Sequence, residues 1–253
     1  TLQVPIATSS DDAEERGANA TSSVGRMDLT STDLEFVNDG NDGDQYLGLR
    51  FSNLNIPKGS IINKAYIQFA TDEIGGTSGS VVFKVEDTDS SATFTGITNN
   101  ISSRSTINTD SVIWSSIPSW TNIGDRGVDQ QTNDLSSLIQ LLVNRTGWKS
   151  GNALSFIASG TGKRVAFSLD GSTNPSQIPT LVVEFIAPVI KTFNILSSSD
   201  DAEENLTAGG ISLSSTDIEL TTDRAINQLI GLRYQNIAIP PGAIIQNAYL
   251  QFY

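Results

Sequence analysis

The residues best suited to chemistry form a run of carboxylates near the start of the chain: Asp11, Asp12, Glu14 and Glu15. In an extended strand, Asp12 and Glu14 lie on one face, and Asp11 and Glu15 lie on the other. Like charges held this close are costly unless a cation neutralises them. Carboxylate oxygens are the ligands that Ca²⁺ prefers in proteins. The run therefore predicts a structural calcium site.

Further carboxylates can join this run. Asp33 and Glu35 share one face of an extended segment, opposite two apolar residues that we assign to the core. If that segment lies beside the first strand, the two sets of carboxylates converge. A hairpin near residue 170 can add one more, and the same arrangement returns later in the chain. The candidate ligands for Ca²⁺ are Asp11, Asp12, Glu14, Glu15, Asp33, Glu35, Asp170, Asp201, Glu203, Asp217 and Glu219.

Two other interpretations of the acidic run compete with calcium binding. Most Asp and Glu side chains are solvated, so the run can be a plain acidic surface. Paired carboxylates can also hydrolyse glycosidic bonds when they stand about 5–10 Å apart in a cleft. Here no aromatic-lined groove is evident near the run, and the run itself recurs later in the chain. The sequence therefore predicts that the protein is not an enzyme.

Tryptophan offers a possible sugar-binding surface. Trp114 and Trp148 stand among apolar or small residues and are expected in the core. Trp120 follows Pro118 in a predicted loop, so it is the better candidate for an exposed ring that stacks on a ligand.

Three arginines are expected to pair with carboxylates. Arg50 and Arg233 occupy equivalent positions, each beside a leucine and an aromatic residue. A half-buried arginine in a strand needs a carboxylate partner, and we predict Asp33 or Glu184 for Arg50. Arg164 is expected to act in the same way.

The acidic run belongs to a repeated block. Its segments return in the same order about 185 residues later, which is the signature of a tandem repeat. The chain ends about a third of the way into the second copy, so we expect that copy to be truncated and incompletely packed. The matching segments are residues 10–15 with 199–204, 31–35 with 215–219, 48–51 with 231–234, 56–62 with 239–245, and 65–69 with 248–252.

Composition excludes several classes of function. The chain contains neither cysteine nor histidine, which rules out disulfides, thiolate metal sites and His-based triads. Its formal net charge is −13. An acidic protein of this kind is not expected to bind nucleic acid or an anionic membrane surface. No apolar run approaches membrane-spanning length, so membrane insertion is not expected either.

Apolar residues recur with a period of two through most of the chain, which indicates β-strands. Examples are residues 47–51, 65–69, 81–85 and 181–185. Turn residues separate these segments, so the pattern predicts an all-β sandwich. One segment has helical spacing instead, with Leu135, Leu138, Ile139, Leu142 and Val143 after a capping Asn or Asp. It predicts a single short helix over residues 134–145.

The repeat also sets the domain boundaries. We expect a complete module at residues 1–187, a short linker at residues 188–192, and the first third of a second module at residues 193–253. A linker this short restricts how two modules pivot. A linker of this length favours a rod-like array of modules over modules joined by flexible linkers.

Several segments together resemble the DNRLRE-type carbohydrate-binding-module family. The resemblance covers most of residues 1–187 and implies a β jelly roll of secreted or surface-anchored microbial proteins, often with a structural calcium near the first and last strands. The acidic opening at residues 11–15 looks more like a variant found in long extracellular repeat proteins, which favours scaffolding. The segments that carry the resemblance are residues 46–51, 56–61, 65–67, 112–114, 139–140, 147–154 and 179–185.

These expectations combine into one functional hypothesis and one alternative. The hypothesis is a structural or adhesive tandem repeat of an extracellular surface protein or fibre, stabilised by calcium, with any signal peptide upstream or removed. Its partners would be neighbouring modules of the same protein, including a homopolymer in which one subunit completes another. The alternative is a non-catalytic carbohydrate-binding module of a secreted enzyme or adhesin, with a polysaccharide as partner. The short linker and the scarcity of exposed aromatic residues favour the hypothesis.

Overall fold

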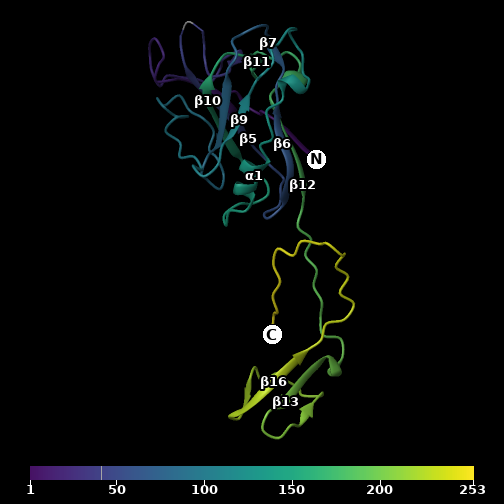
Figure 1. The fold of residues 1–253 in the computed structure, drawn as a ribbon. Coiled ribbons are helices and arrows are strands. Elements are labelled where there is room, and N and C mark those ends of the chain that lie inside the picture. The colour runs from purple at the N-terminus through teal and green to yellow at the C-terminus, as the bar shows by residue number, and fades with distance from the viewer. Residues whose placement is uncertain (41) are drawn as a thin grey trace. The chain divides into compact units, whose positions relative to one another are not determined.

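The computed structural model describes residues 1–40 and 42–253 (Figure 1). These residues form two compact units, Thr1–Pro188 and Val189–Tyr253. The described residues are mostly β-structure, with several antiparallel sheets and one α-helix, as the period-two pattern predicts. No helix among them is long and apolar enough to cross a membrane.

The first unit contains twelve of the strands. They are β1 (Leu2–Pro5), β2 (Asp12–Arg16), β3 (Met27–Asp28), β4 (Asp33–Glu35), β5 (Gln45–Phe51), β6 (Ile61–Gln68), β7 (Thr71–Glu73), β8 (Ser80–Val85), β9 (Val112–Ser115), β10 (Leu154–Thr161), β11 (Val165–Phe167) and β12 (Thr180–Ile186). Short 3₁₀ turns lie at η1 (Ser9–Asp11), η2 (Val128–Gln130) and η3 (Pro175–Gln177).

One layer of the first unit is a six-stranded antiparallel sheet with the order β3-β2-β5-β10-β8-β9. The acidic strand β2 pairs with β5, so that Glu14 lies opposite Leu47. On its other edge β5 pairs with β10, and Phe156 lies opposite Leu49. The central strand β5 is therefore covered on both edges.

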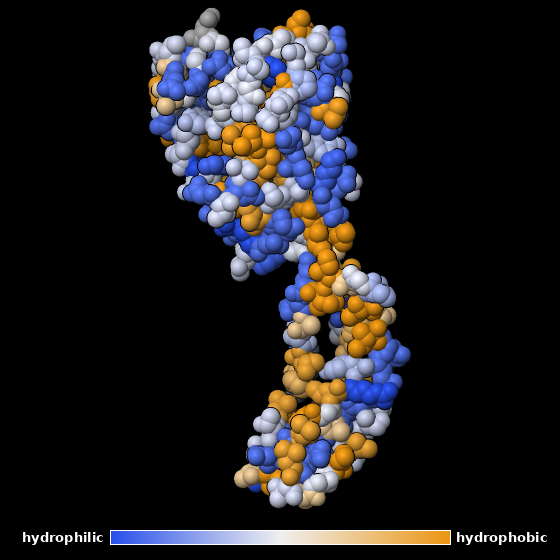
Figure 2. Space-filling view, viewed as in Figure 1, coloured by the Kyte–Doolittle hydropathy of each residue, from blue (hydrophilic) through white to orange (hydrophobic). Residues whose placement is uncertain are grey.

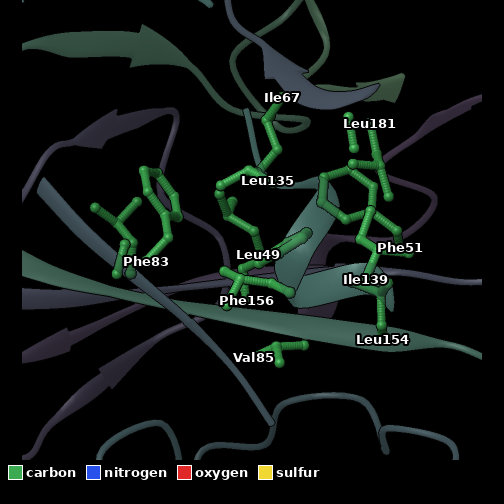
Figure 3. Close-up of a cluster of buried hydrophobic side chains, with 14 of the residues drawn as sticks. Leu49, Phe51, Ile67, Phe83, Val85, Leu135, Ile139, Leu154, Phe156 and Leu181 are labelled. Carbon is green, nitrogen blue, oxygen red and sulfur yellow. The ribbon is translucent and has the colours of Figure 1, made fainter. Parts of the chain in front are cut away.

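The opposite layer is built from two three-stranded sheets, β1-β12-β6 and β4-β11-β7. Strand β7 follows β6 almost directly, and β11 and β12 pair with successive parts of that run. Side chains from both layers meet in one apolar core, which also holds the helix (Figure 3). Leu47, Leu49 and Phe51 alternate along β5 and are fully buried there, as the alternation predicts.

The helix α1 (Ser136–Val143) is the predicted one, shorter by two residues at each end. Asp134 precedes it and accepts hydrogen bonds from the Ser136 amide at 3.0 Å and the Ala65 amide of β6 at 2.9 Å. Thr132 Oγ1 accepts from the Ile67 amide at 3.1 Å, and Gln140 Oε1 accepts from the Ile62 amide at 2.9 Å. The segment around α1 thus binds the edge of β6 that faces away from β12.

The second unit holds the strands β13 (Asp201–Asn205), β14 (Ile211–Ser212), β15 (Thr222–Asp223) and β16 (Ile226–Leu232), after the 3₁₀ turn η4 (Ser198–Asp200). They form one sheet with the order β14-β13-β16-β15. Glu203 lies opposite Ile230, in the register that Glu14 has with Leu47. Residues 233–253 of this unit carry no strand.

Candidate functional site

The four carboxylates of the acidic run are buried. Asp11 is 1% exposed, Asp12 4%, Glu14 6% and Glu15 1%. The interpretation of this run as a plain solvated surface is therefore wrong. The sequence could not reveal this burial, because the covering segments lie far away in the chain. A buried carboxylate is costly unless it is paired or hydrogen-bonded, so each one needs a specific partner.

Asp11 pairs with Arg50. The Arg50 Nη1 atom lies 2.7 Å from Asp11 Oδ1, and Arg50 Nε donates to the Ser91 carbonyl at 3.0 Å. Thr93 Oγ1 also donates to Asp11 Oδ1, at 3.2 Å. The predicted partners of Arg50, Asp33 and Glu184, are wrong. The pairing of β2 with β5 places Asp12 opposite Leu49, which brings the neighbours Asp11 and Arg50 together.

Glu15 lies on the same face and holds the loop that follows β8. Its Oε2 atom accepts hydrogen bonds from the backbone amides of Ile101 at 2.7 Å and Ser102 at 2.9 Å. The same loop packs the Phe94 ring against Gly48 of β5. A Cβ atom added to Gly48 would lie only 2.4 Å from the ring. Asp11 and Glu15 therefore anchor a covering loop.

Asp12 points to the other face of β2, toward the segment after β11. Its Oδ2 atom accepts from the Leu169 amide at 2.7 Å, whereas its Oδ1 atom is buried without a hydrogen-bond partner among the described residues. Burial raises the pKa of Asp12 from 3.8 to about 7, and the negative charges of Asp170 and Asp11 add to the increase, while the Leu169 amide opposes it. Asp170 Oδ1 in turn accepts from Ser9 Oγ at 2.8 Å.

Glu14 shares that face and forms a carboxyl pair with Glu35 of β4. Its Oε1 atom accepts from the Glu35 amide at 3.0 Å and from Gln45 Nε2 at 2.9 Å. Gln45 Nε2 also donates to the Glu35 carbonyl at 2.7 Å. Gln45 thus bridges the two residues. Sequence reasoning missed it, although its recurrence as Gln228 in the second copy was a usable signal.

Both carboxyl groups of this pair have raised pKa values. Burial raises the pKa of Glu14 well above 4.5, and the charge of Glu35 adds to the effect. Burial also raises the pKa of Glu35 to about 7, followed by the charges of Asp33 and Asp39. The hydrogen bond between the two carboxyl groups raises the pKa of Glu14 and lowers that of Glu35. Burial and the neighbouring negative charges therefore favour the neutral form of both carboxyl groups.

A polar pocket of about 120 Å³ opens beside this pair. Four carboxylates and two guanidinium groups line it together with smaller polar side chains, so its surface suits water or a small polar group rather than an apolar ligand. Arg16 in its wall forms an ion pair with Asp42. The lining residues are Glu14, Arg16, Arg26, Met27, Asp28, Ser31, Glu35, Asp39 and Gln45.

The remaining candidate, Asp33, lies on β4 and is partly exposed. Burial, followed by the charge of Glu73, raises its pKa. The carboxylates expected to converge on one ion are thus divided among three places. Asp12 lies with Asp170, Glu14 lies with Glu35, and Asp11 and Glu15 lie on the opposite face of β2. Over residues 1–40 and 42–253, no group of three or more acidic side chains is arranged to hold a metal ion.

The second unit repeats part of this network. Glu203 Oε1 accepts from the Glu219 amide at 2.9 Å, which is the counterpart of the contact between Glu14 and Glu35. Arg233 Nη1 lies 3.4 Å from Asp200 Oδ1. This ion pair is the counterpart of the one between Arg50 and Asp11, in which the two atoms are 2.7 Å apart. Of the other candidates there, Asp201 is half-buried and Asp217 is exposed.

All three tryptophans are buried. Trp114 and Trp148 belong to the core, as predicted. Trp120 is only 1% exposed, so its expected exposure is wrong. Its Nε1 atom donates to the Asp129 carbonyl at 3.1 Å, and its ring lies 6.1 Å from that of Phe36. The Gly75 amide also donates to the Trp120 carbonyl, which holds the loop on the sandwich.

Arg164 helps to hold the same loop. Its Nη2 atom donates to the Ile117 carbonyl and its Nε atom to the Pro118 carbonyl, both at 2.8 Å. It also donates to the carbonyls of Thr77 and Lys163. The expected carboxylate partner is wrong, because backbone carbonyls take the donors of this guanidinium group. No signal in the local sequence distinguishes these two kinds of partner.

No family model matches this chain, and no curated protein matches it.

Proposed function

We propose that the chain consists of tandem jelly-roll modules that serve as a structural or adhesive repeat of an extracellular surface protein or fibre. One observation carries the proposal. The contact between Glu14 and Glu35 and the ion pair between Asp11 and Arg50 recur in the second unit, in the same strand register. A chain that keeps the same internal anchors in successive modules uses them to build each module.

The chemistry of the acidic strand supports a structural role. Each of its carboxylates accepts hydrogen bonds from a different part of the first unit: Arg50, the Leu169 amide, β4, or the loop at Ile101. Charge-assisted hydrogen bonds of this kind are strong and hold loops in a fixed geometry. We propose that the carboxylates hold these parts of the first unit together and that the protein is not an enzyme.

Architecture and composition support the remaining parts of the proposal. Two layers of antiparallel strands around one core fit the jelly roll that the family resemblance implies. An acidic chain without cysteine fits a stable extracellular module that needs no disulfide. The proposed partners are neighbouring modules of the same protein. The carbohydrate-binding alternative has less support, because burial of all three tryptophans leaves none of them to stack on a sugar.

We also propose that Ca²⁺ stabilises the first unit at Asp12 and Asp170. The orphaned, buried Asp12 Oδ1 atom fits a cation, since the metal would supply the partner that the described residues do not. Carboxylate and hydroxyl oxygens are hard ligands that suit Ca²⁺. Two carboxylates are only part of a calcium shell of about six to eight oxygens, so backbone carbonyls and water must complete it.

Thermal unfolding of the full chain in EDTA, in Ca²⁺ and in Mg²⁺ tests this site. Tryptophan fluorescence reports the first unit alone, because Trp114, Trp120 and Trp148 all lie there. We expect a Ca²⁺-selective rise in Tm of several degrees, which corresponds to about 1–2 kcal/mol. Asp12→Asn and Asp170→Asn should abolish the rise, and the loop variant Asp110→Asn should retain it.

The two parts of the proposal can fail separately. An unchanged Tm in Ca²⁺ would reject the metal site and leave the structural role intact. Retention of the full chain on insoluble polysaccharides in a pull-down assay would reject the structural role in favour of the carbohydrate-binding alternative.

A further inference from the structure

The sequence contains a modification motif that the proposed function does not use. N-glycosylation requires Asn-x-Ser/Thr, in which x is not proline. The chain has this motif at Asn19, Asn100, Asn144 and Asn205. So short a motif is not selective in a chain rich in serine and threonine, and the structure decides which asparagine a transferase can reach. The acceptor needs an exposed side chain with a free amide nitrogen, because a bulky glycan is attached there.

Asn144 meets both requirements. It directly follows α1 and is exposed, as is Thr146 two residues later. Asn144 Oδ1 accepts a hydrogen bond from Gln140 Nε2 at 3.1 Å. The Asn144 Nδ2 atom and the Thr146 hydroxyl have no hydrogen-bond partner over residues 1–40 and 42–253. Both groups that the motif supplies are thus free to engage a transferase.

The fold holds this motif in a turn at the surface. Val143 before the turn and Trp148 after it are buried, and Trp148 Nε1 donates to a backbone carbonyl at 2.9 Å. Between them, Arg145 forms ion pairs with two aspartates of the loop after β8. These contacts anchor the turn at both ends and in its middle, so the side chains of Asn144 and Thr146 remain in solvent.

The asparagines of the other three motifs make structural contacts. Asn19 Nδ2 donates to Asp44 Oδ2 at 2.8 Å, so its nitrogen is already engaged. Asn100 is half-buried, and its Oδ1 atom accepts from a backbone amide at 2.9 Å and from Arg104 Nη2 at 3.3 Å. Asn205 of the second unit is half-buried, and its Oδ1 atom accepts from two backbone amides at 2.9 Å. Turning these side chains toward an enzyme would break such bonds.

We propose that Asn144 is an attachment site for an N-linked glycan. The transfer forms a bond between Asn144 Nδ2 and the anomeric carbon of a sugar. It breaks the bond from that carbon to a lipid diphosphate, which departs as the Nδ2 atom loses a proton. The donor is thus an oligosaccharide carried on a lipid diphosphate. The inference rests on the proposed extracellular role, because N-glycosylation modifies surface loops of secreted proteins.

The glycan would lie at the end of the first unit where β12 ends. Gln140 Nε2 donates both to Asn144 Oδ1 and to the Ser60 carbonyl, the latter at 2.9 Å. Ser60 precedes Ile61, which pairs with Ile186, the last residue of β12. Ile186 is 57% exposed, and apolar side chains gather on the surface where β12 ends (Figure 2). A bulky, hydrated glycan would increase the solubility of this apolar end.

Glycan transfer to the purified, folded chain tests the proposal. The enzyme is a single-subunit oligosaccharyltransferase that requires only Asn-x-Ser/Thr, the donor is a lipid-linked oligosaccharide, and peptide mapping by mass spectrometry locates the product. We expect transfer at Asn144 and about tenfold less at Asn19 and Asn100, whose contacts must first break. Synthetic peptides of residues 14–25, 95–106 and 139–150 should all accept the glycan, because the fold and not the local sequence protects the other two sites.

Matched variants at Thr146 sharpen the test. Thr146→Val removes the hydroxyl of the motif and should abolish transfer, whereas Thr146→Ser keeps the hydroxyl and should retain it. Both change an exposed side chain, so the chain should still fold. A folded chain that accepts no glycan at Asn144, or as much at Asn19 or Asn100, would overturn the proposal. Such a failure would not bear on the proposed function, which the polysaccharide pull-down tests separately.

Discussion

The two acidic strands have nearly the same sequence and register but different surroundings. Glu14 of β2 and Glu203 of β13 each accept the amide of a glutamate on a neighbouring segment, at 3.0 and 2.9 Å. Yet the pKa of Glu14 is raised, chiefly by burial, whereas the pKa of Glu203 is lowered, chiefly by that amide hydrogen bond. The amide hydrogen bond lowers the pKa of the accepting glutamate in both units, and burial outweighs it only at Glu14.

The difference lies in what covers each strand. Gly48 of β5 is pressed by the Phe94 ring, while a Cβ atom on its counterpart Gly231 would meet nothing closer than Ala202 Cβ at 3.9 Å. Arg50 has a side-chain exposure of 18%, and Arg233 has 69%. Asp200 and Glu203 are 2% and 7% exposed, as little as Asp11 and Glu14, so the local strands already enclose these side chains and the covering layers account for the raised pKa of Glu14.

The largest expected effect comes from core truncation at matched positions. Leu47→Ala removes a fully buried side chain of the first unit and should lower its free energy of unfolding by about 2–5 kcal/mol. Ile230→Ala, at the corresponding position of the second unit, should leave that transition unchanged. Urea unfolding followed by tryptophan fluorescence measures both. An equal loss in the two variants would show that the units unfold together.

The second prediction concerns pH. The folded pKa values of Asp12 and Glu35 lie near 7, above their ordinary values of 3.8 and 4.5, and that of Glu14 is also raised. The stabilisation they provide is complete below those ordinary values and is lost as the pH rises through about 7. In EDTA, the free energy of unfolding of the first unit should fall by about 3 kcal/mol between about pH 5 and pH 8.

Asp12→Asn sharpens this test, since the neutral side chain cannot ionise. The variant should have a weaker pH dependence and should be more stable than the unaltered chain at about pH 8 without metal. In the second unit, the pKa of Glu203 is lowered and that of Glu219 is raised, so their contributions oppose each other. A first unit whose stability rises over this pH range would contradict the raised pKa values of Asp12, Glu14 and Glu35.

The smallest predicted effect is on stability, when Gly48 of β5 or its counterpart Gly231 of β16 is replaced by alanine. Gly48→Ala places a methyl group against the Phe94 ring and should destabilise the first unit by about 2 kcal/mol through overpacking. Gly231→Ala would make ordinary van der Waals contact with Ala202 and should be close to neutral. Chemical denaturation of the first unit and hydrogen exchange of β16 measure the two effects. A Gly48→Ala variant of unchanged stability would mean that the loop carrying Phe94 can move aside at little energetic cost.

The fold could be predicted to the extent that it depends on local pattern. Alternation along residues 47–51 and 81–85 indicated strands and buried side chains, and the spacing of Leu135, Leu138 and Leu142 indicated the helix. Trp114 and Trp148 were assigned to the core correctly. In each of these segments the period of the apolar residues matches the period of the backbone.

The partners within the site could be predicted only in part. Arg50 reaches Asp11 across 39 residues of sequence, and Glu15 reaches the Ile101 amide across 86. The covering loops have no periodic pattern, so nothing in the sequence indicated that they bury the acidic strand or Trp120. Arg164 donates to backbone carbonyl oxygens. Every residue has such an oxygen, so residue types could not indicate which ones Arg164 binds.

The segment that binds the free edge of β6 also matters while the chain is being made. Thr132, Asp134 and Gln140 reach the amides of β6 from 65 to 78 residues further along the sequence. Until they emerge from the ribosome, β6 can pair with any similar strand nearby. Neighbouring domains of like sequence are prone to such misassembly. One edge of β6 is therefore open until the segment around α1 docks, and the other until β12 is made and pairs with it.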